Sequence, residues 1–410
     1  MTPDRAPSSD QTLPEAIPAQ GTDRPSSDVV EWLRRLVGFP TVSRDSNLAL
    51  IEHVKDYLAA RGIACHVLPN EEGNKANLWA RIGPDRPGGV ALSGHTDVVP
   101  VEGQDWDSDP FTLEERNGAL VGRGTADMKG FLACCLALVP RMQEAPLARP
   151  IDLCFSYDEE VGCRGVDGLI EYIATLENKP GLCLVGEPTG MDVVTGHKGK
   201  LAVECVVKGS IAHSSLAPRA ANAVQTAARL VARIADMADA VERDGPFDPR
   251  YDVEHTTIHV GQLQGGQALN IVPDHCSFVF EFRHLPLDDP FAKLDELKAY
   301  GRELEAAMQK KAPEASVTWT QLFSFPGLDM DEDAEAVTFM KGLAATNSTR
   351  RVAYGTEGGK FQQHAGIPTV ICGPGHIDQA HKANEFAALS QLAEMEQLLG
   401  RLVERLCKDA

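Results

Sequence analysis

The sequence lacks any apolar run long enough to cross a membrane. Its longest uninterrupted apolar stretch, 131–139, is far shorter than the roughly 20 residues that a spanning helix needs. The amino-terminal segment 1–27 also lacks the apolar core that a secretory signal carries. Its proline, serine and polar content predicts a disordered tail. We therefore expect neither a membrane protein nor a secreted one.

Positive charge is in short supply. The chain has 39 lysines and arginines against 59 aspartates and glutamates, which gives a formal net charge of -20. Nucleic acids and anionic membrane surfaces select basic protein surfaces, so neither is an expected partner. A small anionic substrate stays compatible with this charge, because it needs only one or two local cations.

Cysteine spacing gives no sign of a zinc ribbon or a disulfide framework. Ten cysteines are present, but no CxxC pair occurs. Most of them lie in apolar runs, where a small buried thiol is the ordinary interpretation; Cys154, Cys183, Cys205 and Cys372 are examples. Free buried thiols are typical of a reducing compartment, so we expect a cytoplasmic protein.

What the sequence does contain is a regular alternation of strands and helices. With 410 residues the chain exceeds what one core usually serves, so two domains are expected. Helical periodicity covers 29–39, 48–61, 129–142 and 167–177, and apolar strands are predicted at 77–82, 88–94, 150–156 and 181–186. This pattern predicts an α/β fold with a mixed, mostly parallel sheet flanked by helices.

The rhythm changes after about residue 198. Strands at 201–209, 256–263, 276–285 and 316–321 and helices at 222–241 and 290–311 follow in the order β-α-β-β-α-β. This order predicts a ferredoxin-like α+β insertion. The α/β pattern then resumes with a helix near 334–346, a strand at 368–373 and a helix at 388–407. We therefore expect a tail at 1–27, one domain at 28–197 and 322–410, and an inserted domain at 198–321.

Polar residues follow the predicted strands, at the sheet edge where ligands bind in open α/β folds. His95 and Asp97 follow the strand at 88–94, and "YDEEVG" with Glu159 and Glu160 follows the next. Glu187 and then "GPGHIDQAHKANE" follow two later strands, and Asp127 begins the helix at 129–142. Taken singly, each residue is better explained as a cap, a solvated carboxylate or an ordinary histidine.

Together these carboxylates need protons or a cation in order to coexist. Two imidazoles with three or more carboxylates form a ligand set for two borderline metals, most consistent with zinc. Asp127 is the candidate bridge because a carboxylate has two oxygens. His95 and Glu187 complete one shell, and Glu160 and His381 the other. Asp97 is placed to orient His95, and the glutamate of the pair that does not ligate, Glu159, can serve as a general base.

The motifs "SGHTDVVP", "GRGTADMKG", "DEEVG", "GEPTG" and "QAHKANE" resemble those of the di-zinc aminoacylase and carboxypeptidase group. This group includes succinyl-diaminopimelate desuccinylases and acetylornithine deacetylases. The stretches "GFPTVSRDSNLALIEHV", "FDPRYDVEHTTIHVGQLQGG", "ALNIVPDHC" and "YGTEGG" are more similar to the second of these. The resemblance runs from about residue 29 to the end of the chain. It implies a di-zinc exopeptidase-like catalytic domain with an inserted lid through which two subunits form a homodimer.

The resemblance also implies roles for individual residues. The metal ligands are His95, Asp127, Glu160, Glu187 and His381, two Zn²⁺ are bound per subunit, and Co²⁺ can substitute. Glu159 is the base, Asp97 is the partner of His95, and His213 is the lid histidine that stabilises an oxyanion across the dimer interface. The implied substrate-binding residues are Asn270, Arg283, Gly355 and Thr356.

Several alternatives stay open at this point. His213 can instead be the neighbour of a helix cap, and Arg283 can simply pair with Glu281 or Glu254. Lys360 and His376 depart from the pattern of the group and leave substrate preference open, and His376 is a possible stray metal ligand. The expected activity is zinc-dependent hydrolysis of an N-acyl amino acid, with N-acetyl-L-ornithine favoured. A sibling substrate, or a binding protein that kept the fold, is the alternative.

Overall fold

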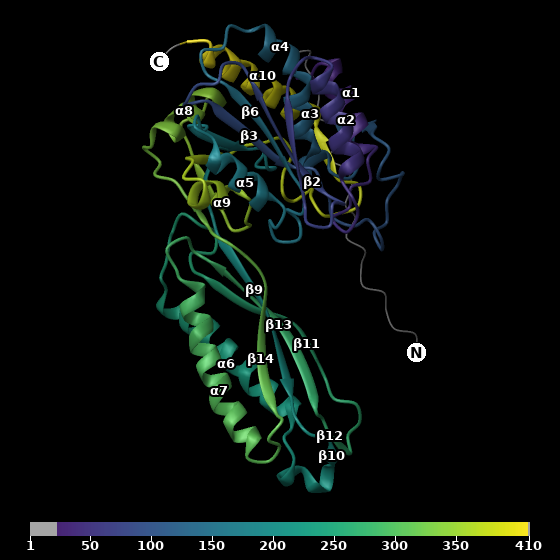
Figure 1. The fold of residues 1–410 in the computed structure, drawn as a ribbon, viewed down its shortest axis with the longest axis vertical. Helices are drawn as coiled ribbons and strands as arrows, with labels where there is room; N and C mark the ends of the chain where they lie inside the picture. The colour runs from purple at the N-terminus through teal and green to yellow at the C-terminus, as the bar shows by residue number, and fades with distance from the viewer. Residues whose placement is uncertain (1–22, 409–410) are drawn as a thin grey trace. The chain divides into compact units, whose positions relative to one another are not determined.

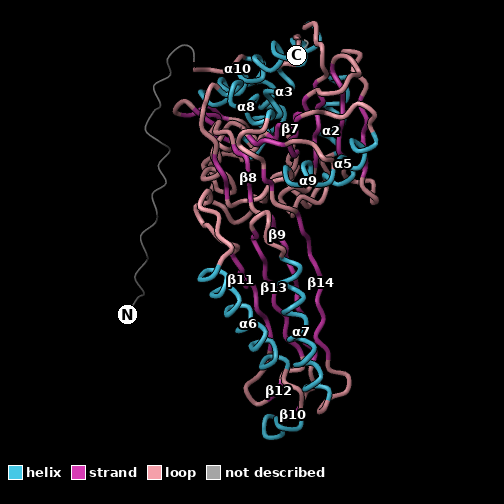
Figure 2. The backbone as a smooth tube through the Cα atoms, turned by 90° about the vertical axis from the view of Figure 1, so that its left-hand side faces the viewer, coloured by secondary structure: helices cyan, strands magenta, loops and turns pink. Residues whose placement is uncertain are grey.

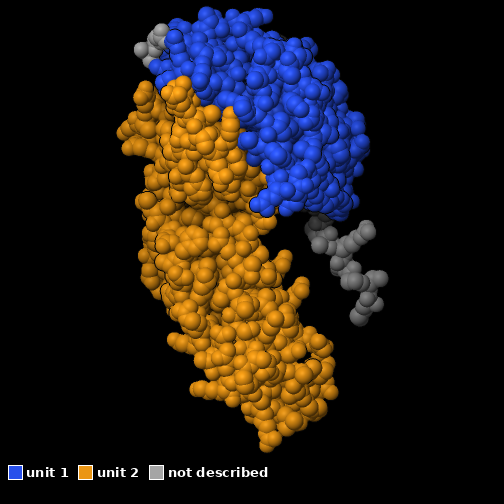
Figure 3. Space-filling view, viewed as in Figure 1, with its two compact units in different colours: residues 1–156, 186–192, 372–410 blue, residues 157–185, 193–371 orange. Residues whose placement is uncertain are grey.

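The computed structural model describes residues 23–408, which form two compact units (Figure 3). Of the described residues, unit 1 comprises 23–156, 186–192 and 372–408, and unit 2 comprises 157–185 and 193–371. The limits of these compact units differ from the domain boundaries expected from the sequence. Those domain boundaries therefore stay a prediction. Most of the expected tail, 1–22, lies outside the described residues. Among the described helices, none combines the length and the apolar character that a membrane span requires.

Unit 1 is built on four strands in the order β1-β2-β6-β3. Their bounds are Cys65–Pro69 (β1), Ala76–Ile82 (β2), Ile151–Ser156 (β6) and Val90–His95 (β3). The neighbouring strands β3 and β6 are parallel, with His95 opposite Ser156, and every residue of both strands is buried. Burial on both faces explains why these segments are apolar runs rather than alternating patterns.

Helices of unit 1 cover this sheet (Figure 1). They are α1 (Ser27–Val37), α2 (Leu48–Ala59), α3 (Gly130–Ala137), α4 (Val139–Glu144) and α10 (Leu389–Leu406). The single helix expected at 129–142 is wrong, because α3 and α4 are separate helices that meet at Leu138. Pro140 has no N–H to continue the helical hydrogen bonds, which accounts for the break. A small antiparallel sheet of β4 (Glu114–Arg116), β5 (Ala119–Val121) and β18 (Phe386–Ala388) completes the unit.

Unit 2 contains a second group of central strands, in the order β7-β17-β8-β15, with β16 also paired to β8. Their bounds are Leu182–Val185 (β7), Thr369–Ile371 (β17), Val194–His197 (β8), Leu328–Asp329 (β15) and Arg350–Val352 (β16). β17 runs parallel to β7, and β16 runs parallel to β8. The helices of this part are α5 (Val166–Thr175), α8 (Glu335–Ala344) and α9 (Gly358–His364).

The rest of unit 2 is a four-stranded antiparallel sheet, which we call the α+β subdomain, in the order β11-β13-β9-β14. Its strands are β9 (Gly199–Lys208), β11 (Thr257–Gly265), β13 (His275–His284) and β14 (Ser316–Phe325). β13 alternates buried and half-buried residues, so one face is apolar. Helices α6 (Ala223–Asp244) and α7 (Pro290–Gln309) pack on that face, as Figures 1 and 2 show.

The fold class expected from the sequence is confirmed. A mixed α/β architecture with parallel strand pairs carries an α+β subdomain whose elements follow the ferredoxin-like order β9-α6-β11-β13-α7-β14. Two short strands, β10 (Ala212–His213) and β12 (Ile271–Val272), and a short helix, η2 (Ser214–Arg219), lie between these elements.

Candidate metal centre

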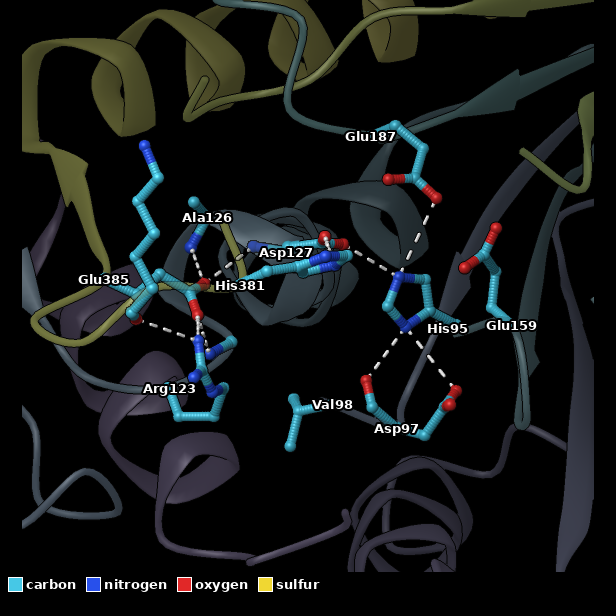
Figure 4. A network of polar contacts seen from close by, with 12 residues as sticks. His95, Asp97, Val98, Arg123, Ala126, Asp127, Glu159, Glu187, His381 and Glu385 are labelled. Atoms are coloured by element: carbon cyan, nitrogen blue, oxygen red, sulfur yellow. Dashed lines mark hydrogen bonds and ion pairs between the residues drawn. The ribbon is translucent and has the colours of Figure 1, made fainter. Parts of the chain in front are cut away.

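His95 is the last residue of β3 and has no exposed surface. Its Nε2 atom lies 3.0 Å from Oδ1 of Asp127 and 3.7 Å from Oε1 of Glu187 (Figure 4). Glycine precedes His95 for a steric reason: a Cβ on Gly94 would lie 2.7 Å from Cε of Met128. The end of this strand therefore directs one imidazole nitrogen at two carboxylates.

The other imidazole nitrogen is held by Asp97. Nδ1 of His95 lies 2.9 Å from the carbonyl oxygen of Asp97 and 3.5 Å from Oδ1 of the same residue. The hydroxyl of Ser43 donates a hydrogen bond to Oδ2 of Asp97 at 2.7 Å, which fixes that carboxylate in turn. These acceptors place a proton on Nδ1 and leave the Nε2 lone pair for a cation.

Asp127 lies in the short helical turn η1 (Thr125–Lys129), where its backbone departs from helical geometry and its peptide bond to Met128 is cis. The side chain is 5% exposed. Oδ1 faces Nε2 of His95 at 3.0 Å, whereas Oδ2 faces Nε2 of His381 at 3.2 Å. Each oxygen of one carboxylate thus meets a different imidazole, which is the arrangement a bridging ligand needs.

His381 reaches Asp127 from the loop before β18. Its backbone φ of +62° belongs to the left-handed region, and its carbonyl oxygen accepts a hydrogen bond from Nε2 of Gln104 at 3.0 Å. The side chain is half exposed, in contrast to the fully buried His95. Solvent therefore reaches the His381 side of the centre.

Electrostatics couple these groups strongly. Burial acts to lower the pKa of His95, but hydrogen bonds to Asp127 and Asp97 and the charge of Glu187 outweigh it and raise the pKa well above its ordinary value. Burial acts to raise the pKa of Asp127, but the two imidazoles outweigh it and hold this pKa well below its usual range. The carboxylates thus stabilise a positive charge at Nε2 of His95. A divalent cation can supply this charge in place of a proton. Imidazole and carboxylate donors fit such a cation.

Two further residues support the centre, and the sequence did not single them out. Glu385 is 1% exposed, and its Oε1 accepts hydrogen bonds from the backbone N–H groups of Ala126 at 2.9 Å and Asp127 at 3.0 Å. Its Oε2 accepts from the N–H of Gly124 at 3.0 Å and from Nη1 of Arg123 at 2.7 Å. Both residues lie inside the motifs "GRGTADMKG" and "QAHKANE", which was the only available signal.

Glu159 and Glu160 belong to unit 2, in the loop that begins directly after β6. The last residue of β6, Ser156, lies opposite His95 in the parallel register. Within the loop, the N–H groups of Gly162 and Cys163 donate to the carbonyl oxygen of Glu159 at 2.9 and 2.8 Å. The thiol of Cys163 donates to Oε1 of Glu159 at 3.2 Å. Burial is the main cause that raises the pKa of this thiol well above its ordinary value, and the negative charge of Glu159 is the second. The thiol therefore stays protonated as a donor.

The remaining candidate residues lie in unit 2. His213 is exposed on β10, and its Nδ1 caps η2 by accepting from the N–H of Ser215 at 3.2 Å. Asn270 is also exposed, and its carbonyl oxygen accepts from the N–H of Ser214 at 2.9 Å. Arg283 donates through Nε to Oε1 of Glu281 at 2.8 Å, which is the pairing that the sequence left open.

Gly355 and Thr356 lie where the chain is tightly packed. A Cβ on Gly355 would lie 2.2 Å from the ring of Phe325, and Thr356 is 1% exposed with its hydroxyl accepting from the N–H of Gly358.

The two residues that depart from the pattern of the group have partners of their own. Lys360 is buried, and its Nζ donates to Oδ1 of Asp167 at 2.7 Å and to the carbonyl oxygen of Cys163 at 2.6 Å. Nδ1 of His376 lies 3.2 Å from Oδ2 of Asp378. Neither contact involves a residue of the metal centre.

The chain matches the model of "Peptidase family M20/M25/M40" over residues 91–405. It is 33% identical over 380 residues to the acetylornithine deacetylase of Myxococcus xanthus, a match that covers 92% of this chain and 96% of that protein. It is 30% identical over 386 residues to the acetylornithine deacetylase of Photorhabdus laumondii, a match that covers 92% of this chain and 97% of that protein.

Solved structures agree on the fold. A tripeptidase from Staphylococcus aureus gives a TM-score of 0.73 at 20% identity, covering 94% of this chain and 100% of that one. An M20 family metallo-carboxypeptidase from Sulfolobus solfataricus gives a TM-score of 0.72 at 18% identity, and the match covers 93% of this chain and 100% of that one. A dinuclear metal binding peptidase of the M20 family from Bacillus subtilis gives a TM-score of 0.56 at 16% identity, and the match covers 92% of this chain and 96% of that one. With the family model covering most of the chain, this protein belongs to peptidase family M20/M25/M40 and is a metal-dependent hydrolase of that family.

Proposed function

We propose that the protein hydrolyses N-acetyl-L-ornithine to L-ornithine and acetate, a step of arginine biosynthesis, in the cytoplasm. The observation that carries the metal-dependent part is the pair of Asp127 oxygens, each of which faces a different imidazole. The names of the relatives at 30% identity and above, over nearly their whole length, support the substrate.

The proposed centre holds two Zn²⁺ per subunit, with Co²⁺ as an active substitute. Asp127 would contact both cations, His95 and Glu187 would hold one of them, and Glu160 and His381 would hold the other. Position along the chain supports Glu160, since it follows β6, whose last residue is opposite His95. When bound, such cations would polarise an acyl carbonyl and lower the pKa of a water molecule.

In the proposed reaction Glu159 accepts the proton of the attacking water and returns it to the leaving amine, which becomes the α-amino group of ornithine. The thiol of Cys163 and two backbone N–H groups hold Glu159 in place. Asp97 keeps the proton of His95 on Nδ1. His213 donates to the oxyanion of the tetrahedral intermediate, a contribution of about 3–4 kcal/mol for a well-placed donor.

Recognition of the substrate is assigned to unit 2. Arg283 and Asn270 bind the α-carboxylate, and Gly355 and Thr356 form the pocket wall. An arginine can bind a carboxylate with two parallel hydrogen bonds, and Arg283 has two nitrogens left beyond the Nε that contacts Glu281. His213 is proposed to act on the active site of the partner subunit in a homodimer.

The test is to load the protein with Zn²⁺ and measure free amine release from N-acetyl-L-ornithine and, separately, from N-succinyl-diaminopimelate. Rapid release from the acetyl substrate alone supports the proposal. Release from the succinyl substrate alone keeps the mechanism and overturns the substrate. Bound metal with no hydrolysis of any acylated amino acid makes the protein a binding protein of this family. Glu159→Ala in the same assay gives the background rate.

A further inference from the structure

Glu385 is a carboxylate whose hydrogen-bonding capacity is used entirely within unit 1. It accepts from three backbone N–H groups of the turn that carries Asp127 and from the guanidinium of Arg123. The donors at Ala126 and Asp127 are consecutive, so Oε1 fixes the orientation of the two peptide groups that precede the Asp127 side chain. A buried N–H without an acceptor is unfavourable, so this turn depends on the carboxylate for its shape.

Arg123 extends the same network toward His381. Its side chain is 1% exposed, and Nη1 donates both to Oε2 of Glu385 and to the carbonyl oxygen of Lys382. Nη2 donates to Oε1 of Gln104, and the amide nitrogen of Gln104 donates to the carbonyl oxygen of His381 at 3.0 Å. One continuous chain of hydrogen bonds therefore joins the backbone of Asp127 to the backbone of His381, as Figure 4 shows for its central part.

Neither Glu385 nor Arg123 directs a side-chain atom at the space between the imidazoles. Both oxygens of Glu385 are turned to backbone N–H groups and to Arg123, and Arg123 carries only donors. These residues consequently act on the metal ligands through the backbone. Partners at this distance from a metal commonly change its affinity by 10- to 100-fold when they are altered.

We propose that Glu385, Arg123 and Gln104 form a clamp that holds Asp127 and His381 at the separation required to bind two cations, so that they are positioning residues for the dinuclear centre. This inference rests on the proposed metal site. It adds that the second cation, the one held by His381, depends on Arg123 and Gln104, whereas both cations depend on Glu385, because Glu385 sets the bridging Asp127.

The experiment is a titration of the chelator-stripped full-length protein with Co²⁺, followed by visible absorption and calorimetry. Gln104→Ala removes the donor to His381 and leaves the buried Arg123–Glu385 pair intact, so the variant keeps its fold. We expect one of two binding events to weaken by about 10-fold or more while the other stays within threefold. Glu385→Gln is expected to weaken both events and to change the Co²⁺ spectrum, and Glu385→Asp to restore part of the loss.

The matched control is Asp152→Asn. Asp152 is equally buried and forms a two-pronged pair with Arg81, both contacts at 2.8 Å, and it joins β2 to β6 away from the ligands. We expect this variant to lose thermal stability without any change in Co²⁺ affinity. The proposal is overturned if Gln104→Ala binds both cations as the parent does, or if Glu385→Gln loses stability while its two affinities stay within threefold of the parent.

This readout separates the clamp from the proposed substrate. A parent protein that binds two cations, loses one event in Gln104→Ala and does not hydrolyse N-acetyl-L-ornithine supports the clamp and contradicts only the activity. A parent that binds a single cation overturns the dinuclear site and the clamp together.

Discussion

At the scale of single residues, Glu159 separates metal binding from turnover. The proposed function assigns it proton transfer and no metal contact. Glu159→Ala is therefore expected to keep the fold and the full metal content while losing about 10²–10⁴-fold in kcat, the usual contribution of a general base. The measurement is steady-state amine release beside metal analysis of the same sample. Near-normal turnover would remove Glu159 from this role, and loss of metal would make it a ligand.

A second residue-scale prediction concerns pH and His197. This side chain has no exposed surface, and its burial lowers its pKa to about 4. A hydrogen bond to the carbonyl oxygen of Lys198 acts in the opposite direction, and the charge of His284 adds to the lowering. Both ring nitrogens are used by the neutral form: Nδ1 donates to Lys198, and Nε2 accepts from the N–H of Gly359. Folding therefore favours the neutral ring, whereas the unfolded chain takes up a proton near pH 6.5.

The sign follows from this difference in proton uptake. The unfolded state binds more protons between pH 6.5 and about 4, so His197 lowers the free energy of unfolding as the pH falls through that window, by about 3 kcal/mol in all. Urea unfolding from pH 7 to 4 should show a steeper loss in the parent than in His197→Asn, a variant whose side chain does not titrate. Parallel curves for the two proteins would contradict the prediction.

The candidate metal ligands could be proposed from the sequence for a physical reason. Strands buried on both faces are apolar runs, so the polar residues that end them stand out, and parallel strands bring those ends to one edge. Arg123 and Glu385 could not be found in this way. They are 262 positions apart, and nothing in the local pattern of either shows that it is buried or that the two form a pair.

At the scale of elements, Lys360 ties α9 to the segment that leads from the glutamate loop into α5. Its ammonium donates to Asp167 in α5 and to the carbonyl oxygen of Cys163, whose thiol contacts Glu159. Lys360→Met keeps the buried volume but leaves that carbonyl without this donor. We expect a loss of about 1–3 kcal/mol in the free energy of unfolding, toward the lower end because Asp167 is half exposed.

Urea unfolding at pH 7 measures this loss, and Lys55→Met is the control. Lys55 on α2 pairs with Glu52 on a solvent-exposed face, so its replacement should leave the midpoint of urea unfolding almost unchanged. If the two variants unfold at the same urea concentration, the buried contacts of Lys360 contribute nothing to stability.

The elements themselves were predictable where a long periodic pattern exists. In β13 the buried residues alternate along the whole strand, and in α10 the buried positions recur at helical spacing, so both were found close to their observed bounds. The two-residue strands β10, β12 and β15 were missed, because a pattern so short has no period to detect. Their existence depends on partners far along the chain.

At the scale of the whole molecule, the proposed homodimer assigns His213 of unit 2 to the active site of the partner, whose proposed metal ligands, apart from Glu160, lie in unit 1. His213 is exposed, and its Nδ1 is used as a cap, which leaves Nε2 as the atom that can donate to an oxyanion. If it serves the active site of the partner subunit, His213→Ala keeps its metal and its fold but inactivates the partner's site. Each of the variants Glu159→Ala and His213→Ala is then inactive as a homodimer.

Mixing these two inactive variants gives the last prediction. In a heterodimer one active site combines the Glu159 of one subunit with the His213 of the other, so it contains both groups. Random exchange of subunits makes half of the dimers mixed, and each mixed dimer has one complete active site out of its two. About one quarter of the parent activity should therefore return. Native mass spectrometry verifies the exchange. Exchange without recovered activity would mean that His213 acts within its own subunit or takes no part in the reaction. Loss of metal from His213→Ala would instead identify it as a ligand.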